Sequence, residues 1–475
     1  MNNTEKKTLT PQMFGAVADG VTDDYKALAA AIEAASREGK TLELPEGNYR
    51  TEHYLVLDHI NVQSHNATIS CYDLTLNMPA IDMRNNVNIY GTLTVYHVNS
   101  VKWTHGGRAG MGFGNYETGV GAHNCYVEHV IFLGGSFLGA NAVFVTGDSS
   151  DLTFGKITVP EGTEYGRAFL SHWGGTKSHN AVAPGNASAG IWHAENADYT
   201  KHPHGVKIGT IEHLGATEVP ELASALALSA SYDFTVDELI CKNTTTAVEI
   251  LGGDAAFEWA APEVKAIGMR GLYVKKITAT GMTRRVITLC PYTGYLNFLS
   301  VKCQLTIDEA DISVSPNCKE SAVMAYCMDN VKIGKLTVRD WNGSDDVAAV
   351  RLTAATQNTY IDELNFENCT GALLRMQTSL KRTEPTKNVQ IASMTVKGCK
   401  NPESAAIICT NVEDARIASL SVDGSSEYKY LLSATPASKN ICVEALNTEN
   451  KELATAVLLA DGVTDANKIC IGKSI

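Results

Sequence analysis

The stretch from Met13 to Lys26, MFGAVADGVTDDYK, places a glycine-containing turn directly in front of a helix start. Asp19-Gly20 is a turn signal, because glycine adopts the backbone angles that tight turns need. Thr22 or Asp23 can then cap the first helical turn, where the helix dipole also favours acidic side chains. The stretch therefore predicts a tight loop that leads into a short helix.

The residues that follow continue this helix and then change to strands. Gly39 is placed to end the helix, and residues 41–50, TLELPEGNYR, read as a strand, a turn and the start of another strand. Because apolar residues recur along one face at helical spacing, we expect the helix to be amphipathic. The residues on that face are Leu28, Ala29, Ile32 and Ala35.

Two pieces of this opening resemble a known superfamily. The sequence FGAVADGVTDD at 14–24, followed after an alanine-rich helix by LPEGNY at 44–49, closely resembles the start of the pectate-lyase-like right-handed β-helices. That superfamily includes polygalacturonases, polysaccharide lyases, epimerases and bacteriophage tailspike depolymerases, and the lead-in LTPQMFG at 9–15 is most similar to the tailspike version. The resemblance implies a β-helix whose open apolar end is covered by the helix, and a polysaccharide as the substrate class. It supplies no catalytic residue.

The second half of the chain carries a repeat. An apolar-x-x-apolar motif recurs within strand-like segments, and from Ile333 to Val443 its copies lie 28, 30, 26 and 26 residues apart. A second apolar motif precedes many of these copies, so each period holds at least two short strands separated by turns. Copies of the first motif begin at Ile208, Val236, Val274, Ile333, Ile361, Ile391, Ile417 and Val443, and copies of the second at Ala247, Ala349, Ala406 and Ala456.

A repeat of this length with short strands predicts an all-β fold, a right-handed parallel β-helix with a short N-terminal capping α-helix. Propeller blades need about 40–45 residues, and the leucine-rich repeat pattern does not occur. We expect residues 1–50 to form the cap and residues 51–475 to form the β-helix. Loops inserted mainly within 100–290 would then supply a binding face.

The composition of the 475-residue chain limits the classes of partner. Its formal charge of −13 disfavours non-specific binding to nucleic acid or to anionic lipid. No apolar run approaches the roughly 18 residues of a membrane-spanning helix, and the opening MNNTEKKTLTPQMFG lacks the apolar core of a secretory signal. We therefore expect neither nucleic acid nor a membrane as a partner.

The 12 cysteines are scattered singly and form no CxxC pair. This usage predicts buried thiols that act as small hydrophobic side chains, in a chain that folds in a reducing cytoplasm. Combined with the tailspike resemblance, it favours a final place in a phage tail, or otherwise inside the cell.

Polar chemistry is concentrated in the first half, because all 13 histidines lie between His53 and His213. Several of them stand close to tryptophans and acidic residues in glycine-rich segments that read as long loops. A tryptophan face can stack on a sugar ring while neighbouring polar groups bond its hydroxyls; alternatively, the aromatics fill loop cores and the histidines are ordinary turn residues. The set comprises Trp173, Trp192, His193, Asp198 and His202 for substrate binding and His172, Glu195 and His204 for catalysis.

The same set offers ligands for a metal. His202-x-His204, with His193, Glu195 or Asp198 nearby, has ligand types that suit zinc or manganese, but this spacing is common in proteins. We expect no cofactor and keep a divalent metal as the minor alternative.

A pair of acidic residues beside an aromatic suggests glycosidase chemistry. Asp254 and Glu258, next to Trp259, lie in a long insertion outside the repeat. Glycosidases use two carboxyl groups, one to protonate the leaving oxygen and one to activate water or attack directly. Tyr232-Asp233, about one coil earlier, could supply a substrate contact and one catalytic partner; the alternative is a set of solvated loop charges.

Arginines offer a third chemistry. Lyases that act on uronic acids neutralise the substrate carboxylate with a cation and remove the adjacent proton with a base. Arg270, Arg284 and Arg285 lie close together in sequence, and Arg108 and Arg167 lie in the histidine-rich half. Arg270 is taken as a substrate-binding candidate, against the alternative of paired surface arginines.

The preferred hypothesis is a polysaccharide-degrading enzyme of the tailspike type, acting by hydrolysis or by β-elimination on a bacterial surface or other polysaccharide. Two alternatives remain: a carbohydrate-binding or structural β-helix without catalysis, and a sugar epimerase. Association side by side into a homotrimer is compatible with the fold, although the cap begins within about ten residues of Met1 and the repeat runs nearly to Ile475.

Overall fold

The computed structural model describes residues 8–72, 78–98, 109–115, 118–135, 141–163, 165–172, 202–215, 224–229, 231–251, 270–289, 301–326, 328–344, 346–353, 356–378, 384–449, 452–453 and 456–472. The chain divides into two compact units, of which unit 1 holds the described residues up to Ile240 and unit 2 those from Cys241 onward. Each unit is considered by itself below.

The N-terminal helix α1 (Tyr25–Glu38) forms as expected, with its predicted apolar face against strands of unit 1. Gly39 ends it in the left-handed conformation, with φ 62°. The predicted N-cap at Thr22 or Asp23 is wrong, because the helix begins after Asp24. The buried Asp24 carboxylate accepts hydrogen bonds from the backbone N–H groups of Val17 (2.7 Å) and Ala18 (2.9 Å) and so holds the preceding loop against the helix start.

Unit 1 consists of parallel strands in two sheets, with a 3₁₀ turn at Pro11–Phe14. Its long strands form sheet A: β1 (Thr8–Leu9), β2 (Asp19–Asp23), β3 (Thr41–Leu44), β4 (Asn48–Thr51), β6 (Ile60–Cys71), β8 (Val87–Val98), β10 (His123–Gly135), β12 (Ser150–Val159), β14 (His204–His213) and β16 (Tyr232–Lys242). Sheet B contains β5 (Leu55–Leu57), β7 (Ile81–Met83), β9 (Ala109–Phe113), β11 (Asn141–Val145), β13 (Arg167–Ser171) and β15 (Ser224–Ser229).

Unit 2 repeats the arrangement. Within this unit, sheet A contains β18 (Arg270–Met282), β20 (Val301–Val314), β22 (Met328–Arg339), β24 (Gln357–Glu367), β26 (Thr386–Lys397), β28 (Val412–Val422), β30 (Lys439–Thr448) and β32 (Ile469–Ile471). Sheet B contains β17 (Thr246–Leu251), β19 (Ile287–Leu289), β21 (Val323–Tyr326), β23 (Val350–Thr353), β25 (Leu374–Gln377), β27 (Lys400–Thr410), β29 (Glu427–Ala434) and β31 (Val457–Leu459), with a 3₁₀ turn at Asp465–Asn467.

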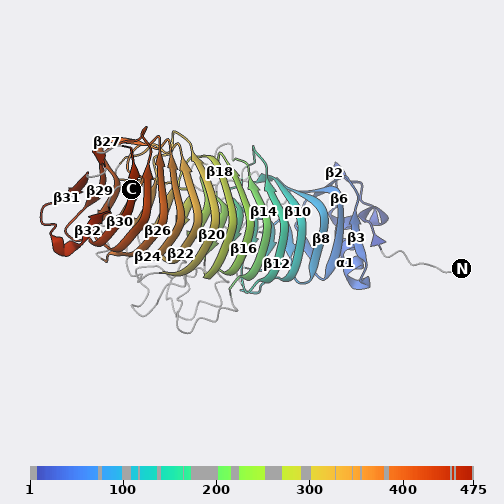
Figure 1. The fold of residues 1–475 in the computed structure, drawn as a ribbon. Coiled ribbons are helices and arrows are strands. Elements are labelled where there is room, and N and C mark those ends of the chain that lie inside the picture. The colour runs from blue at the N-terminus through green and yellow to red at the C-terminus, as the bar shows by residue number, and fades with distance from the viewer. Residues whose placement is uncertain are drawn as a thin grey trace, which may run out of the picture. The chain divides into compact units, whose positions relative to one another are not determined.

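Each coil contributes one long strand to sheet A and one short strand to sheet B. This arrangement is the right-handed parallel β-helix expected from the repeat (Figure 1). The apolar-x-x-apolar motif marks a bend in the long strand. In β24, Ile361 and Leu364 are buried, whereas Asp362 and Glu363 between them are exposed. Two consecutive outward residues interrupt the usual alternation of a strand, so the chain turns a corner there.

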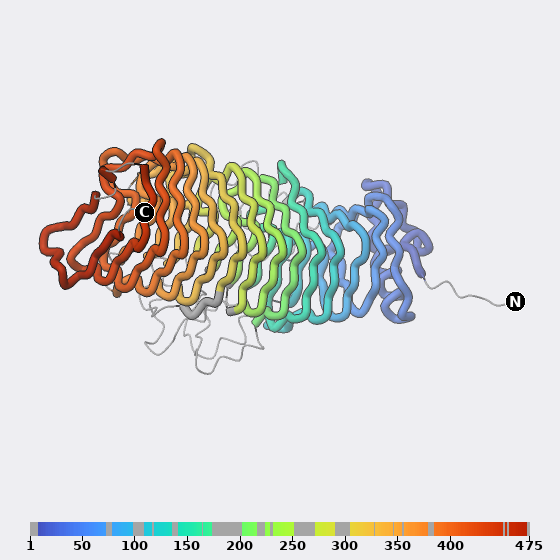
Figure 2. The backbone as a smooth tube through the Cα atoms, viewed as in Figure 1, coloured from blue at the N-terminus to red at the C-terminus, as the bar shows by residue number. Residues whose placement is uncertain are grey.

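The repeat predicted from sequence is confirmed residue by residue in unit 2. Equivalent apolar side chains stack in register on successive coils and are at most 4% exposed. Figure 2 shows the corresponding backbone turns lying side by side within this unit. The stacked positions are Ile307, Ile333, Ile361, Ile391, Ile417 and Val443.

The core of unit 1 contains a series of aromatic rings in addition to its aliphatic side chains. Phe113, Phe154, Phe169 and Phe234 form an edge-to-face series with ring centroids 5.2, 5.6 and 6.1 Å apart. All four are essentially inaccessible to solvent. The glycine-rich segments of the first half were expected to be long loops, but the described parts of 103–213 consist largely of regular strands.

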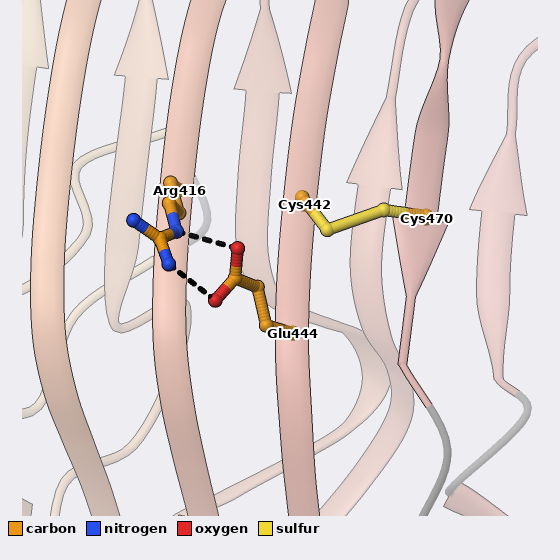
Figure 3. The surroundings of a disulfide bond; sticks show 4 residues. All are labelled: Arg416, Cys442, Glu444 and Cys470. Atoms are coloured by element: carbon orange, nitrogen blue, oxygen red, sulfur yellow. Dashed lines mark hydrogen bonds and ion pairs between the residues drawn. A yellow bond between two sulfur atoms is a disulfide. The ribbon is translucent and has the colours of Figure 1, made fainter.

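The cysteine prediction holds for most of the thiols and fails for one pair. The free cysteines of the described part are all buried: Cys71, Cys125, Cys241, Cys318, Cys369, Cys399 and Cys409. Cys442 and Cys470 instead form a disulfide between register partners on β30 and β32 (Figure 3). Both are at least partly exposed on the outside of the coil, so they are not buried thiols. Within the described ranges, no helix has the length and hydrophobicity to cross a membrane.

Candidate functional site

Titratable side chains gather on the outer face of sheet A in unit 1, across four consecutive coils. His129 on β10 is the register partner of Lys156 on β12, and Thr158 on β12 is the register partner of Glu212 on β14. We call this group the His129 cluster. It comprises Thr92, Glu128, His129, Lys156, Thr158 and Glu212.

The bend of the long strand explains why these residues face outward. Val127 and Val130 of β10 are buried, and Glu128 and His129 occupy the two outward positions between them. Val127-Glu-His-Val130 is therefore another copy of the apolar-x-x-apolar motif. The sequence prediction missed this copy because it followed the motif only from Ile208 onward, and the same spacing could have revealed it.

A chain of hydrogen bonds crosses the coils through His129. The His129 Nδ1 atom lies 3.2 Å from the Thr92 hydroxyl, and Nε2 lies 3.1 Å from the Thr158 hydroxyl. Thr158 donates its single proton to Glu212 Oε2 at 3.1 Å. Its oxygen must then accept from His129 Nε2–H, so a neutral His129 carries its proton on Nε2 and uses Nδ1 as the acceptor.

Two further contacts fix the charged members. Lys156 Nζ lies 2.8 Å from Glu212 Oε1, and Glu128 Oε2 accepts a hydrogen bond from the Gly91 N–H at 2.8 Å. Gly91 has φ 75°, and a Cβ there would collide with the carbonyl oxygen of Ser64. Only glycine fits this position without strain, so the backbone donor that holds Glu128 depends on it.

The surroundings of His129 lower its pKa and so favour the neutral imidazole. Partial burial lowers the pKa of the imidazole, and the positive charge of Lys156 lowers it further. The negative charges of Glu212 and Glu128 oppose this shift but do not outweigh it. A neutral imidazole with an unprotonated nitrogen can remove a proton, and the two glutamates can stabilise the cation that forms.

His204 begins β14 at the end of the strand away from Glu212, so it is not part of the His129 cluster. Its Nδ1 atom lies 2.8 Å from the backbone oxygen of His202, and its side chain is half-buried. Its register partner is Ser150, whose hydroxyl lies 3.0 Å from His123 Nδ1. His204 therefore belongs to a second row of polar residues, which lies at the beginnings of β10, β12 and β14.

His202 and Tyr232 lie inside unit 1 and not on its surface. His202 is 0% exposed and Tyr232 is 4% exposed, and their rings meet edge to face at 5.7 Å between centroids. Both side chains are buried, so this placement does not support the substrate contact expected of them, which stays a prediction. His172 follows β13, and its backbone N–H donates to the Val145 carbonyl at 2.9 Å.

Asp233 occupies a turn position that recurs in the fold. Its φ of 54° lies in the left-handed region, as do the φ angles of Asn86, Asn124 and Asp151 at the same place in other coils of unit 1. Asn and Asp tolerate this conformation better than other non-glycine residues. The identity of Asp233 is thus explained by the turn, although its exposed carboxylate stays accessible.

The remaining sequence candidates lie outside the described residues, and they stay predictions. These are Trp173, Trp192, His193, Glu195, Asp198, Asp254, Glu258 and Trp259, together with the side chain of Arg270 at the start of β18. Among the side chains that the structure describes, none form a group of three or more His, Cys, Asp or Glu that could hold a metal.

Comparisons with known proteins give partial similarities. No family model matches the chain. A capsule K30/K69-specific depolymerase of Klebsiella phage K64-1 is 29% identical over 150 residues, which is 25% of this chain and 18% of that protein. The match thus covers less than a fifth of the depolymerase's own length.

Solved structures with a similar course of the chain share little sequence. The surface adhesin PfbA of Streptococcus pneumoniae matches over 90% of this chain and 87% of its own, with a TM-score of 0.46 and 13% identity. The catalytic unit of a GH87 α-1,3-glucanase from Streptomyces thermodiastaticus matches over 96% and 68%, with a TM-score of 0.40 and 12% identity. The Dettilon tailspike protein matches over 96% and 68%, with a TM-score of 0.29 and 13% identity.

Proposed function

We propose that this protein degrades an acidic polysaccharide by β-elimination at the His129 cluster. The observation that carries the proposal is the hydrogen-bond chain through His129, which leaves Nδ1 as an acceptor and joins Nε2–H through Thr158 to Glu212. The partial sequence similarity to a phage capsule depolymerase supports a polysaccharide as the substrate class and a phage tail as the place of action.

The reaction needs a sugar with a carboxylate at C5 and the glycosidic oxygen at C4. His129 Nδ1 takes the C5 proton, the C–H electron pair becomes the C4–C5 double bond, and the C4–O bond breaks towards the leaving oxygen. Solvent water supplies the proton to that oxygen. Lys156, on the neighbouring coil, faces the substrate carboxylate and favours the negative charge that develops next to it.

Product analysis tests the reaction class. Elimination leaves an unsaturated sugar that absorbs in the near ultraviolet, whereas hydrolysis releases reducing ends without this absorbance. We expect absorbance and reducing ends to rise together on at least one polymer in a panel of bacterial acidic polysaccharides. Reducing ends without absorbance would contradict elimination and would favour hydrolysis, for which Asp254 and Glu258 are the candidates from sequence.

A polymer that binds and is never cleaved would favour the remaining alternative, a carbohydrate-binding protein without catalysis. Wild-type protein is compared with His129→Gln in both assays, since binding without chemistry should not depend on the acceptor nitrogen of His129. Sedimentation of the same preparation tests whether the protein forms the homotrimer with which the fold is compatible.

A further inference from the structure

A pocket in unit 1 lies between helix α1, near the start of the chain in Figure 1, and the segment that contains β5. Its volume of about 370 Å³ falls within the range of roughly 300–1,000 Å³ that is typical of small-molecule sites. One wall is formed by residues of α1 that recur every three or four positions and so share one face of the helix: Tyr25, Ala29, Glu33 and Ser36. Residues 53–56 and 58 form the other wall.

Small side chains on the helix keep this pocket open. Ala29 contributes only a methyl group where it lies between Tyr25 and Glu33 on the same face, so the space in front of it is not filled. Ile32 and Leu55 also line the pocket and are 8% and 2% exposed. The pocket therefore has an apolar floor and an opening that is lined by polar and aromatic groups.

Three rings stand around this floor. Tyr25 and His53 meet edge to face with their ring centroids 4.8 Å apart, and Tyr54 lines the same pocket. His53 is exposed, so a ligand can reach the group from solvent. A tyrosine face packs well against the CH groups of a sugar ring and also attracts an ammonium group.

The Asp58 carboxylate is held in place at the end of the second wall. Its Oδ1 atom accepts a hydrogen bond from the Asn85 N–H at 3.1 Å and lies 2.8 Å from His59 Nδ1. The Ser36 hydroxyl donates to the Asp58 backbone oxygen at 2.9 Å and so joins α1 to this wall. The side chain of Asp58 is 42% exposed, which leaves it accessible to a ligand in the pocket.

The charges around the pocket favour a positive ligand. Glu33 on α1 adds a second carboxylate, and its neighbour Arg37 lies 4.0 Å away with its side chain 66% exposed to solvent. Among the lining residues that the structure describes, none is Lys or Arg. An ammonium group gains charge-assisted hydrogen bonds from such carboxylates, whereas a carboxylate ligand would be repelled by them.

We propose that this pocket binds an amino-sugar unit, with its free ammonium group at Asp58 and its ring against Tyr25 and the apolar floor. The site goes beyond the proposed function, because it shares no residue with the His129 cluster and needs no elimination. It also differs in ligand, since the two carboxylates disfavour an acidic sugar unit. A free monosaccharide and a residue of a polymer present the same ammonium-bearing ring, and the experiment separates these two sources.

Isothermal titration calorimetry of the full chain with glucosamine, N-acetylglucosamine and glucose tests the site, at a pH at which the amine of glucosamine is protonated. These sugars share one ring and differ in the charged group. We expect glucosamine to bind about tenfold or more tightly than the other two, because only glucosamine offers a charged donor. A trimer of glucosamine that binds more tightly per unit than the monomer assigns the site to a polymer, and equal affinity per unit assigns it to the free sugar.

A substitution that fills the pocket gives a test without removing a polar group. Ala29→Leu should weaken glucosamine binding about tenfold or more, because the larger side chain occupies the space of the ring. Ala30→Leu is the matched control, since it adds the same group to the same helix at a residue that does not line the pocket. It should leave binding unchanged. Equal affinities in these two variants would overturn the site.

Substitutions of the carboxylates test the ammonium contact. Asp58→Asn keeps an oxygen for the Asn85 N–H and should weaken glucosamine binding about tenfold while leaving glucose unaffected. Glu33→Gln should weaken it only about twofold, because Glu33 is exposed. Glu38→Gln is the control, since it removes the same charge from α1 outside the pocket. Melting temperatures identify a variant that loses stability, and the Ala29→Leu result then decides.

The outcomes separate this site from the proposed function. No binding of glucosamine or its trimer, or equal affinity for glucosamine and glucose, would overturn the amino-sugar site whether or not a polymer is cleaved. Binding of glucosamine that depends on Ala29 and Asp58, without cleavage of any acidic polymer, keeps the site and contradicts the lyase. Cleavage of an acidic polymer at the wild-type rate by Ala29→Leu, with glucosamine binding lost, keeps both.

Discussion

The long strands of the two units carry different side chains at the same outward-facing bend. In unit 2, long strands present rows of opposite charges that neutralise one another from coil to coil, as Lys335 and Glu363 do. In unit 1, the equivalent bend presents a histidine hydrogen-bonded to hydroxyls on both neighbouring coils. A row of opposite charges can stabilise any β-helix. An imidazole placed between two hydroxyl groups is not explained by such a structural role. This difference is the reason why we choose unit 1 for the candidate catalytic site.

The largest effect is expected from substituting the histidine that distinguishes the outer face of unit 1. His129→Gln should lower the rate of polymer cleavage by about 100- to 10,000-fold, because a general base contributes about that much. His123→Gln is the matched control on the same strand, since His123 also lies 3.0 Å from a hydroxyl of the next coil. Steady-state rates for both variants, with their melting temperatures, make the test. Equal rates in the two variants would remove the cluster from the mechanism.

Large-to-small substitutions should distinguish the aromatic series of unit 1 from the aliphatic stack of unit 2. Phe154→Ala removes the second ring of the aromatic series in unit 1 and should cost about 3–5 kcal/mol of unfolding free energy. Ile361→Val removes one methyl group from the aliphatic stack in unit 2 and should cost about 0.5–1.5 kcal/mol. Urea denaturation measures both. A smaller loss for Phe154→Ala would show that the aromatic series is not a tightly packed core.

Acidic pH should lower the stability of unit 1, because its His213 side chain is buried. Burial lowers the pKa of His213 from 6.5 to about 4, so the folded state holds this side chain neutral. Its contribution to stability is complete above pH 6.5 and is lost as the pH falls towards 4, because the unfolded chain takes up the proton first. A shift of this size corresponds to about 3 kcal/mol. Melting temperatures of wild type and His213→Leu between pH 7 and 4 test this, and parallel curves would contradict it.

The smallest effect on stability is expected from reversing one charge in the row of alternating charges in unit 2. Lys335→Glu puts a negative group between Glu309 and Glu363 and should cost at most about 1 kcal/mol, less at high salt. Lys332→Glu is the control, because its register partners Thr306 and Tyr360 are uncharged. Melting temperatures at low and high salt measure the difference. Equal losses in both variants would show that the alternation does not contribute to stability.

The fold could be predicted because its signals are local. The helix and its Gly39 stop follow from spacing along a short stretch, and the stacked Ile333 and Ile361 repeat at a nearly constant interval. The helix cap was predicted one or two residues too early, at Thr22 or Asp23. Asp24 takes this place because its carboxylate holds the preceding loop, which the spacing does not show. The coil that contains Phe154 was not predicted because this phenylalanine occupies the first aliphatic position of the motif, in register with Val127 and Ile208.

The candidate site could be predicted only in part. The excess of histidine in the first half points to unit 1, but the contacts of His129 depend on which coils are neighbours. Thr158 and Glu212 meet across 54 residues of sequence, twice the usual interval, so no fixed spacing could pair them. Burial of His202 likewise follows from packing between coils and not from the His-x-His spacing that made it a candidate.

The most direct test of a chemical role for unit 1 is a crystal structure of the His129→Gln variant with an acidic oligosaccharide that the wild type cleaves. We expect the sugar to lie across β10, β12 and β14, with its carboxylate at Lys156 and its C5 hydrogen facing the substituted side chain. An oligosaccharide bound elsewhere, with Lys156 and Glu212 still paired and uncovered, would contradict this account.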